Sequence, residues 1–481
     1  MNLMDSMKAM MMKQAAKLVA NVVRTGDVDQ MAGLFSTLSK LAKEPVKSGL
    51  KKMADGAKEH DPMYVSWSKL FQKANPKVVE KVINNLIINE FAVGEKVRQE
   101  KMHEYKTVLP KLAVISPTYA CNLRCVGCYA ALYGHKYQLS KEEMFSIIRQ
   151  FNDLGIYFFI ITGGEPYFYP YIYDVFKEFN DSFFMTYTNG TLIDDEHAKL
   201  LSELGNVTLA ISIEGFEEMT DWRRGKGVFN KVKEAWNNLN KYGVIFGASV
   251  TATRVNHELL MSDEFWDYLS QNGVAYAWVF QFMPVGADAS MDLVPTPEQR
   301  YERFRKTDEL RLSGKFAFVA DFWNHGFLTH GCLAAGSKYL HINAKGYAEP
   351  CVFQQFAVDN IREKSIIEIL KSPFFEAYKR TIPYSQNLFR PCPIIDNPKV
   401  FRSMVNKFNA IAQHPGSERV ITDLAPELDK LSEDWKVYAD KLWYEEGYSE
   451  KYPSKRGVYN YETRMRRYAS NEEKLALDKK G

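Results

Sequence analysis

Three of the six cysteines in this 481-residue chain lie within eight residues of each other, as Cys121, Cys125 and Cys128. Thiolates at this spacing can bind a metal from a single loop. A structural zinc site needs four ligands, yet no histidine or fourth cysteine lies within about five residues of the three. A [4Fe–4S] cluster held by three thiolates leaves one iron open to a substrate or cofactor. The spacing therefore favours such a cluster over an incomplete zinc site or a loop of buried cysteines.

A second motif, Thr162-Gly163-Gly164-Glu165-Pro166, follows the apolar stretch 157–161. CxxxCxxC after one apparent strand and GGEP after the next resemble the motifs of the radical S-adenosylmethionine (radical SAM) superfamily. The resemblance implies that the open iron binds the amino and carboxylate groups of S-adenosylmethionine (SAM). It also implies reductive cleavage of SAM to a 5′-deoxyadenosyl radical, which abstracts hydrogen from an unactivated carbon. An external electron donor of the flavodoxin or ferredoxin type is implied as well.

The same resemblance predicts which residues contact SAM. Gly163 and Gly164 let the backbone run close to the ligand because they carry no Cβ. Glu165 is expected to accept hydrogen bonds from the SAM ammonium, and Pro166 to fix the turn. Tyr129, one residue beyond the third cysteine, or the backbone there, is expected to contact the adenine. Further contacts with the ribose hydroxyls and the carboxylate are expected at the ends of the third and fourth strands and just beyond: Thr188, Asn189, Ser212, Glu214 and Arg224.

The elements that position these residues alternate between apolar runs and helical patterns. We expect strands at 112–116, 157–161, 183–188, 208–213, 245–253 and 275–282, and helices near 141–154, 171–180, 195–204, 229–242 and 262–272. Such alternation predicts a parallel sheet. Six units fall short of a complete eight-stranded barrel, and the resemblance implies a partial (β/α)6 barrel. Its functional residues should lie at the carboxyl ends of the strands.

The other three cysteines follow the barrel, as Cys332, Cys351 and Cys392. An apparent hairpin turns at 343–346 between the first two of them. The spacing of Cys332, Gly346 and Cys351, with thirteen and then four residues between them, resembles the opening of the SPASM and twitch extensions, which hold auxiliary iron–sulfur clusters. Three cysteines allow at most one auxiliary [4Fe–4S] cluster, as in the twitch type. Its fourth ligand stays open between Asp396, water and substrate. The alternative is that these are ordinary buried cysteines.

The sequence thus predicts an α/β protein with five regions: helical 1–110, barrel 111–283, bridge 284–330, auxiliary-cluster domain 331–400 and helical tail 401–481. Residues 1–60 carry ten Lys or Arg against six Asp or Glu, with methionine-rich amphipathic patterns at 7–24 and 29–42. They are either a cap on the barrel or a contact with an anionic membrane or lipid. A longer helix is expected at 76–101, with Phe91 among the residues that face a core. A capping box at Ser140–Glu143 should open the helix near 141–154. In the tail, an apolar stripe at helical spacing is expected to be core: Leu428, Leu431, Trp435, Tyr438, Leu442 and Trp443. A net charge of +3 gives no reason to expect nucleic acid.

Six cysteines in so long a chain indicate metal binding in a reducing compartment rather than disulfides. Neither a transmembrane run nor a signal peptide is expected, so the prediction is a cytoplasmic protein, with peripheral contact at the inner membrane face if residues 1–60 bind lipid. Three functions stay open: a radical enzyme acting on an apolar lipid, a radical enzyme maturing a peptide or protein, and a non-enzymatic iron–sulfur or zinc scaffold.

Overall fold

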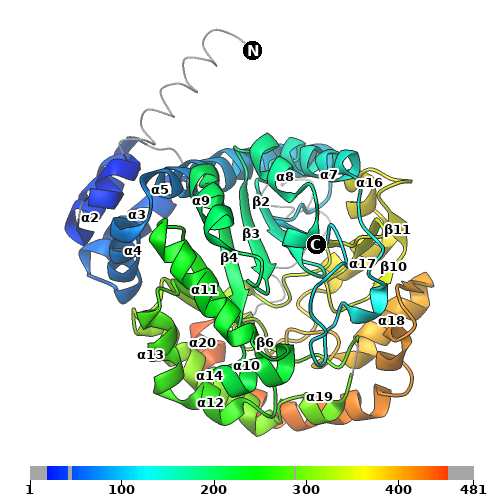
Figure 1. Cartoon of the computed structure of the whole chain (residues 1–481). Coiled ribbons are helices and arrows are strands. Elements are labelled where there is room, and N and C mark those ends of the chain that lie inside the picture. The colour runs from blue at the N-terminus through cyan, green and yellow to red at the C-terminus, as the bar shows by residue number, and fades with distance from the viewer. Residues whose placement is uncertain (1–18, 26, 42–45, 287–288, 453–481) are drawn as a thin grey trace.

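A computed structural model describes residues 19–25, 27–41, 46–286 and 289–452. Its centre is a twisted sheet surrounded by helices (Figure 1). Ten strands follow the order β11-β9-β8-β1-β2-β3-β4-β5-β6-β7. Their bounds are β1 Ala113–Ile115, β2 Phe158–Ile161, β3 Phe183–Thr188, β4 Val207–Ser212, β5 Phe246–Ala252, β6 Tyr276–Gln281, β7 Phe318–Asp321, β8 His341–Ile342, β9 Tyr347–Glu349 and β11 Asp359–Asn360. A separate antiparallel pair joins β10 (Phe356–Ala357) to β12 (Ile411–Ala412).

The predicted parallel barrel is confirmed, and it has two strands more than expected. β7 comes from the apolar run 316–322, which the sequence analysis placed in a bridge, and it pairs in parallel with β6. β8 pairs in parallel with β1, where Val114 lies opposite His341. The hairpin predicted at 343–346 therefore forms, as β8 and β9, and it also extends the sheet. Among the described strands β7 and β8 are not paired with each other, so the barrel stays incomplete.

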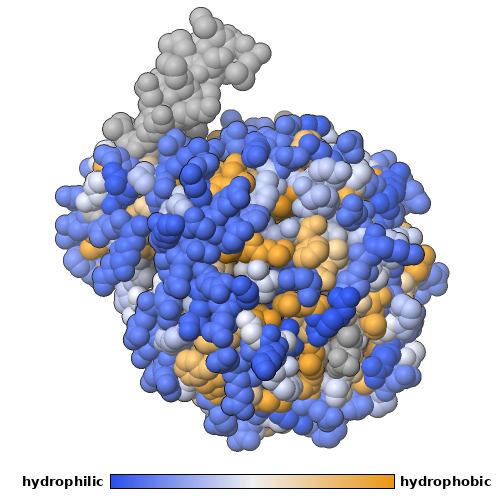
Figure 2. All heavy atoms as spheres, in the orientation of Figure 1, coloured by the Kyte–Doolittle hydropathy of each residue, from blue (hydrophilic) through white to orange (hydrophobic). Residues whose placement is uncertain are grey.

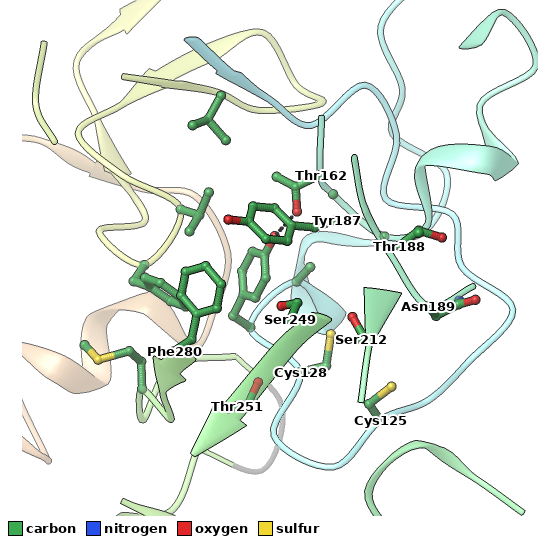
Figure 3. Close-up of a pocket in the computed structure, with 18 of the residues that line it drawn as sticks. Cys125, Cys128, Thr162, Tyr187, Thr188, Asn189, Ser212, Ser249, Thr251 and Phe280 are labelled. Atoms are coloured by element: carbon green, nitrogen blue, oxygen red, sulfur yellow. Dashed lines mark hydrogen bonds between the residues drawn. The ribbon is translucent and has the colours of Figure 1, made fainter. Parts of the chain in front are cut away.

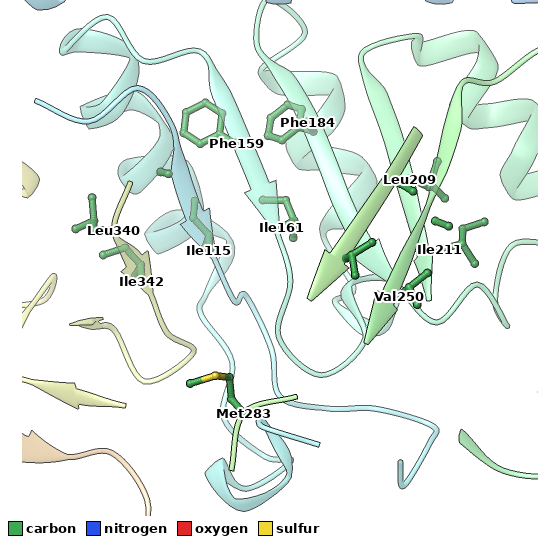
Figure 4. Close-up of a cluster of buried hydrophobic side chains, with 14 of the residues drawn as sticks. Ile115, Phe159, Ile161, Phe184, Leu209, Ile211, Val250, Met283, Leu340 and Ile342 are labelled. Carbon is green, nitrogen blue, oxygen red and sulfur yellow. The ribbon is translucent and has the colours of Figure 1, made fainter. Parts of the chain in front are cut away.

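Helices cover the outer face of the sheet: α7 Lys141–Asp153, α8 Ile172–Glu178, α9 Asp195–Leu204, α10 Glu217–Arg224, α11 Val228–Lys241, α12 His257–Met261, α13 Asp263–Gln271 and α14 Pro297–Leu312. α7 begins with the expected capping box, in which the Glu143 N–H donates to Ser140 Oγ (3.1 Å) and the Ser140 N–H donates to Glu143 Oε2 (2.7 Å). Alternate strand residues pack outward against these helices, as Ile115, Phe159 and Ile161 do in Figure 4.

The remaining strand residues face inward, where the N-terminal helices meet them. These helices are α2 Val28–Leu41, α3 Val46–Lys58, α4 Pro62–Lys73, α5 Pro76–Lys81 and α6 Glu95–Tyr105, and the segment Val82–Gly94 between α5 and α6 is π-helical. Val79 and Ile83 share one buried cluster with the inward residues Val114 and Ile160. The N-terminal region therefore closes one end of the barrel, as the cap interpretation expected.

Hydrogen bonds show which end of the barrel is closed. The Asn75 N–H donates to the Gly243 carbonyl, and the Asn85 amide donates to the Ser182 carbonyl. Gly243 and Ser182 stand just before strands β5 and β3, so the helices lie along the amino ends of the strands. The carboxyl ends of the strands remain available for chemistry. The first amphipathic pattern, 7–24, lies largely outside the described residues.

The π-helical winding changes which side chains of the predicted helix 76–101 are buried. Phe91, expected to face the core, is 55% exposed. Asn85 and Glu90 are buried in its place. A π-helix has more residues per turn than an α-helix, because its hydrogen bonds run from i to i+5, so an apolar stripe predicted at α-helical spacing drifts off the buried face.

The C-terminal part folds back onto the barrel through α15 Gly326–Thr329, α16 Ile366–Leu370, α17 Pro373–Thr381, α18 Pro398–Phe408, α19 Ala425–Asp440 and α20 Tyr448–Lys451. Leu428, Trp435 and Leu442 of the predicted apolar stripe are buried. The charged last dozen residues lie outside the described part. In the described helices no stretch is long and apolar enough to cross a bilayer. Hydrophilic side chains cover most of the face in Figure 2, and hydrophobic ones gather toward its middle.

Candidate active site

A cavity of about 270 Å³ opens at the carboxyl ends of the strands. Figure 3 shows Cys125 and Cys128 beside the ends of β4 and β5. Ten of the residues predicted from the sequence line this cavity: Cys121, Cys125, Cys128, Tyr129, Gly163, Gly164, Thr188, Asn189, Ser212 and Arg224. Segments that are far apart in the sequence thus meet as the predicted barrel requires.

The three thiols at one end of the cavity suit iron binding. Burial raises the pKa of Cys121 to about 11 and also raises the pKa of Cys128, where Arg223 and Arg224 oppose the rise. Thiols with raised pKa values hold their protons at neutral pH unless a metal displaces them. The Leu123 N–H already points at Cys121 Sγ (3.4 Å), a hydrogen bond of the kind that supports cluster sulfur. These residues therefore fit a cluster held by three cysteines.

A zinc site is a poorer fit to the same residues. It needs four ligands around one ion. The motif supplies only three cysteines, one fewer than a closed zinc site requires.

The loop that carries these cysteines is attached to the barrel at several points. The Val126 N–H donates to the Arg223 carbonyl (2.8 Å), and the Asn189 amide donates to Asn122 Oδ1 (2.9 Å). Gly127 has a φ of +66°, and a Cβ there would lie 2.2 Å from the Phe282 ring. The residue before the third cysteine is therefore glycine because an aromatic side chain already occupies the adjacent space.

The two glycines of the GGEP motif serve backbone packing. A Cβ on Gly163 would lie 2.3 Å from the Thr118 carbonyl, and one on Gly164 would lie 2.4 Å from the Ala120 carbonyl. The Gly164 N–H donates to the Thr118 carbonyl and the Glu165 N–H to the Ala120 carbonyl, both at 2.9 Å. The motif is thus pressed against the segment that leads into Cys121. Both glycines also line the cavity, as the ligand contact predicted for them requires.

Glu165 and Pro166 of the motif do not themselves line the cavity. Pro166 begins the 3₁₀ turn Pro166–Phe168. The Glu165 carboxylate turns inward and accepts from Thr188 Oγ1 (2.7 Å), the Asn189 N–H (2.8 Å) and the Tyr167 N–H (3.2 Å). Burial raises its pKa to about 7, and these hydrogen bonds limit the rise. Glu165 therefore positions the end of β3 around the cysteine loop, and its predicted contact with the SAM ammonium stays a prediction.

Glu214 also lies outside the residues that line the cavity, and its predicted contact with the ribose stays a prediction. Its Oε1 accepts from Arg223 Nη1 (2.7 Å) and Arg224 Nε (2.9 Å), and its Oε2 accepts from the Thr251 N–H (3.1 Å). Burial opposes ionisation, but the two guanidinium groups lower the pKa of Glu214 below its usual value. Glu214 therefore holds both arginines at the cavity wall, where Arg224 was predicted to meet a carboxylate.

Tyr129 lies where the sequence places it, in the cavity wall after the third cysteine. Its hydroxyl is within 2.9 Å of Thr162 Oγ1, and its ring packs edge-on against Phe353. Burial raises its pKa well above the usual value. The ring is therefore held rigidly by both modules of the chain.

The sequence analysis did not identify the apolar wall that continues the cavity away from the cysteines. It is formed by side chains from the strands and from the C-terminal module: Leu112, Val114, Phe158, Ile160, Tyr187, Trp278, Phe280, Phe322, Leu333, Val352 and Phe353. Ser249 and Thr251 on β5, and Trp278 and Phe280 on β6, are alternate residues that point inward. The alternation of inward and outward side chains along the predicted strands was the sequence pattern that could have identified this wall. The outcome is one cavity with a thiol end and an apolar end.

Cys332, Cys351 and Cys392 line a second cavity of about 50 Å³. Burial raises the pKa of Cys332 to about 12 and that of Cys351 to about 11, and it raises the pKa of Cys392 as well. The three predicted thiols are therefore gathered in one buried place, as an auxiliary cluster requires. Phe322 and Phe353 line both cavities, so only a thin layer of side chains separates them.

Asp396, one of the candidates for a fourth auxiliary ligand, is already engaged. Its carboxylate accepts from Arg300 Nη1 (2.6 Å) and from the Cys392 N–H (2.9 Å). It is fully buried and does not line the cavity of the three cysteines. Moving it onto a metal would leave the Arg300 guanidinium buried without its partner, which is costly.

Comparison with known proteins gives the same two modules. Residues 115–261 match the Radical SAM superfamily, and residues 332–393 match an iron–sulfur cluster-binding domain, SPASM. The AdoMet-dependent heme synthase of Oleidesulfovibrio alaskensis is 28% identical over 56% of this chain and 76% of its own length. The sporulation killing factor maturation protein SkfB of Bacillus subtilis is 29% identical over 54% of this chain and 65% of its own length.

A solved structure shares the fold. SuiB of Streptococcus suis, bound to precursor peptide SuiA, covers 66% of this chain and 76% of its own chain with a TM-score of 0.52 and 17% identity. The matched domains imply [4Fe–4S] clusters and SAM. The two groups of three cysteines and the polar residues that line the larger cavity are suited to hold them. The chain is therefore a radical SAM enzyme whose partial barrel is followed by a SPASM-type iron–sulfur domain.

Proposed function

We propose that this enzyme abstracts hydrogen from a carbon atom of an apolar group on a peptide substrate. The observation that carries the proposal is the continuity of the cavity: the thiols of Cys121, Cys125 and Cys128 and the aromatic side chains of Trp278 and Phe280 line the same space. A reacting carbon held at the apolar end would be kept from water and close to the radical source.

Residues at different positions along the cavity would have different functions. Cys121, Cys125 and Cys128 would hold the catalytic cluster, which together with SAM supplies a 5′-deoxyadenosyl radical when bound. Arg224, fixed by Glu214, presents a guanidinium to the cavity and suits a carboxylate partner. Asn189 and Ser212 add hydrogen-bonding groups at the same end. The aromatic wall excludes water, which protects a reactive intermediate from side reactions.

Of the two radical-enzyme functions left open by the sequence, the comparisons support a peptide substrate over a lipid. The relative from Bacillus subtilis is named as a maturation protein of a killing factor, and the Streptococcus suis structure contains a precursor peptide. An apolar side chain of a peptide would enter the cavity, while its backbone stayed at the mouth.

A lipid-like substrate is the second candidate, and one structural feature favours it. The apolar wall continues to Leu112 and Phe158 at the amino ends of β1 and β2, which pack in one cluster with Leu86 and Ile87 of the N-terminal helices. A long hydrocarbon chain could follow this wall deeper than a side chain would.

Anaerobic reconstitution tests the cleavage of SAM, a step that both candidate functions share. The reduced, cluster-loaded protein should convert SAM to 5′-deoxyadenosine, and the C121A/C125A/C128A variant should not. Absence of cleavage by the fully loaded protein would contradict the enzymatic assignment.

Mass spectrometry of cells with and without the protein separates the substrates. A mass change in a peptide fraction supports the first candidate, and a change confined to the lipid extract supports the second. Deuterium transferred from labelled substrate into 5′-deoxyadenosine identifies the carbon.

A further inference from the structure

The auxiliary-cysteine cavity contains one polar side chain whose function the fold does not explain. Gln354 lines this cavity together with Cys332, Cys351 and Cys392. It follows Cys351 in a tight turn, in which the Gln354 N–H donates to the Cys351 carbonyl (3.1 Å). The side chain is 1% exposed. Its carboxamide is therefore held beside the cysteines and away from water.

Neither carboxamide atom of Gln354 has a hydrogen-bond partner in the described protein. The next residue provides a direct contrast. Gln355 is equally buried, but its Nε2 donates to the Tyr129 carbonyl (2.8 Å) and its Oε1 is paired with His414. A buried amide without hydrogen-bond partners is destabilising. An unpartnered amide beside three thiols therefore points to a partner that is present only when the cysteines hold a metal cluster.

The chemistry of the site identifies that partner. A backbone bridge joins Cys351 to Gln354, and both residues line the same cavity. An amide N–H donates well to a thiolate or a sulfide, both of which become more negative when an iron–sulfur cluster is reduced. Hydrogen bonds to cluster sulfurs are among the factors that set the reduction potential.

We propose that Gln354 donates from Nε2 to the Cys351 thiolate or an adjoining sulfide of the auxiliary cluster and thereby raises the reduction potential of that cluster. The inference rests on the auxiliary cluster implied by the SPASM domain, and the identity of the substrate does not enter it. Gln354 acts on the cluster as a positioning and tuning residue.

The test replaces Gln354 by methionine, which has a similar length and no amide. The C121A/C125A/C128A background leaves only the auxiliary cluster, so an EPR-monitored redox titration reports on that cluster alone. Q354M should bind the same amount of iron and sulfide but have a more negative potential. At a fixed potential the ratio of reduced to oxidised cluster should fall about tenfold, which corresponds to about 59 mV for one electron.

A matched control is Q271L, which removes an amide from an exposed position at the end of α13 and should leave the potential unchanged. If Q354M loads poorly, Q354L repeats the test with a branched side chain. A loaded variant with the wild-type potential would overturn the proposal. Variants that fold but bind no auxiliary cluster would also overturn it, because a hydrogen-bond donor alone is not needed to hold the iron. No activity is measured, so this outcome is independent of the proposed substrate.

Discussion

Two buried carboxylates arrange the cysteine end of the cavity without lining it. Glu165 binds the end of β3 through Thr188 and Asn189, and Glu214 binds two adjacent arginines through one oxygen. Each carboxylate fixes the orientation of the neighbouring hydrogen-bond donors. A site that holds its ligand in a single geometry needs such fixed donors. Loss of either charge should therefore disturb ligand binding indirectly.

The first prediction concerns Glu214. E214Q keeps the side-chain size but removes the charge that Arg223 and Arg224 share. Removing one partner of a buried ion pair costs about 3–5 kcal/mol, so the thermal midpoint should fall and SAM should bind at least tenfold more weakly. Calorimetry and anaerobic SAM titration measure both effects. E214D keeps the charge and should retain more affinity than E214Q, and equal affinity in the two variants would contradict the ion-pair argument.

A second prediction concerns acid stability and His414. Burial and then the nearby charge of Lys345 lower the pKa of His414 to about 4, whereas an unfolded histidine titrates near 6.5. The folded protein therefore binds this proton less readily than the unfolded chain. The resulting stability is present above about pH 6.5 and is lost as the pH falls through about 4.

Urea unfolding midpoints measured between pH 7.5 and 4.5 should fall more steeply in the wild type than in H414Q. Glutamine cannot take up the proton, so parallel pH profiles for the two proteins would show that another group is responsible.

At the scale of elements, the site depends on backbone contact between two consecutive βα loops. The GGEP segment after β2 hydrogen-bonds to the segment after β1 at Thr118 and Ala120. The β8–β9 hairpin adds a second support, because His341 lies between Ser116 Oγ and Glu349 Oε2 at 2.7 Å from each. This buried chain of hydrogen bonds runs from the residue after β1 to β9, two residues before Cys351. The loops of the two cysteine groups are thus parts of one connected structure.

The third prediction tests the loop contact. In G164A the new methyl group would lie 2.4 Å from the Ala120 carbonyl, so the segment before Cys121 must move. The variant should lose most of the iron of the catalytic site and its SAM cleavage, while the auxiliary cluster remains detectable by EPR. G49A is the matched control, because a Cβ at Gly49 meets nothing within 4 Å. A fully loaded and active G164A would mean that the close approach is not required.

At the scale of the whole molecule, the N-terminal helices and the barrel form one folded body. Arg98 is 1% exposed; it donates to the Gly155 carbonyl just before β2 and pairs with Glu90 Oε1 at 2.7 Å. Glu90 in turn accepts from the Tyr157 N–H (2.7 Å). Because these bonds join the π-helical segment and α6 to the start of β2, the closed end of the barrel should not open independently of the rest.

The fourth prediction follows from this junction. R98M leaves the Glu90 carboxylate buried without its cation, so the protein should lose on the order of 3 kcal/mol of stability and still unfold in a single transition. Differential scanning calorimetry of the loaded protein measures both. The double variant E90Q/R98M removes the buried charge as well and should recover part of the loss. A separate early transition in R98M would show that the N-terminal helices are an independent unit.

The sequence by itself determined the chemistry and the order of the elements. The cysteine spacing, the GGEP motif, the apolar alternation and the capping box at Ser140 act over a few residues, so they can be recognised without coordinates. The six inner strands and the three thiols around one cavity follow from them, because parallel strands bring their carboxyl ends together.

Only the tertiary structure decided the rest. The hydrogen-bond partners of Glu165 and Glu214, the pairing of β7 and β8, and the π-helical winding that turns Phe91 outward all depend on contacts between residues that are far apart in the chain. The apolar wall of the cavity and the unpartnered Gln354 have the same origin. They arise where the barrel, the N-terminal helices and the auxiliary module pack together, and no local sequence pattern encodes that packing.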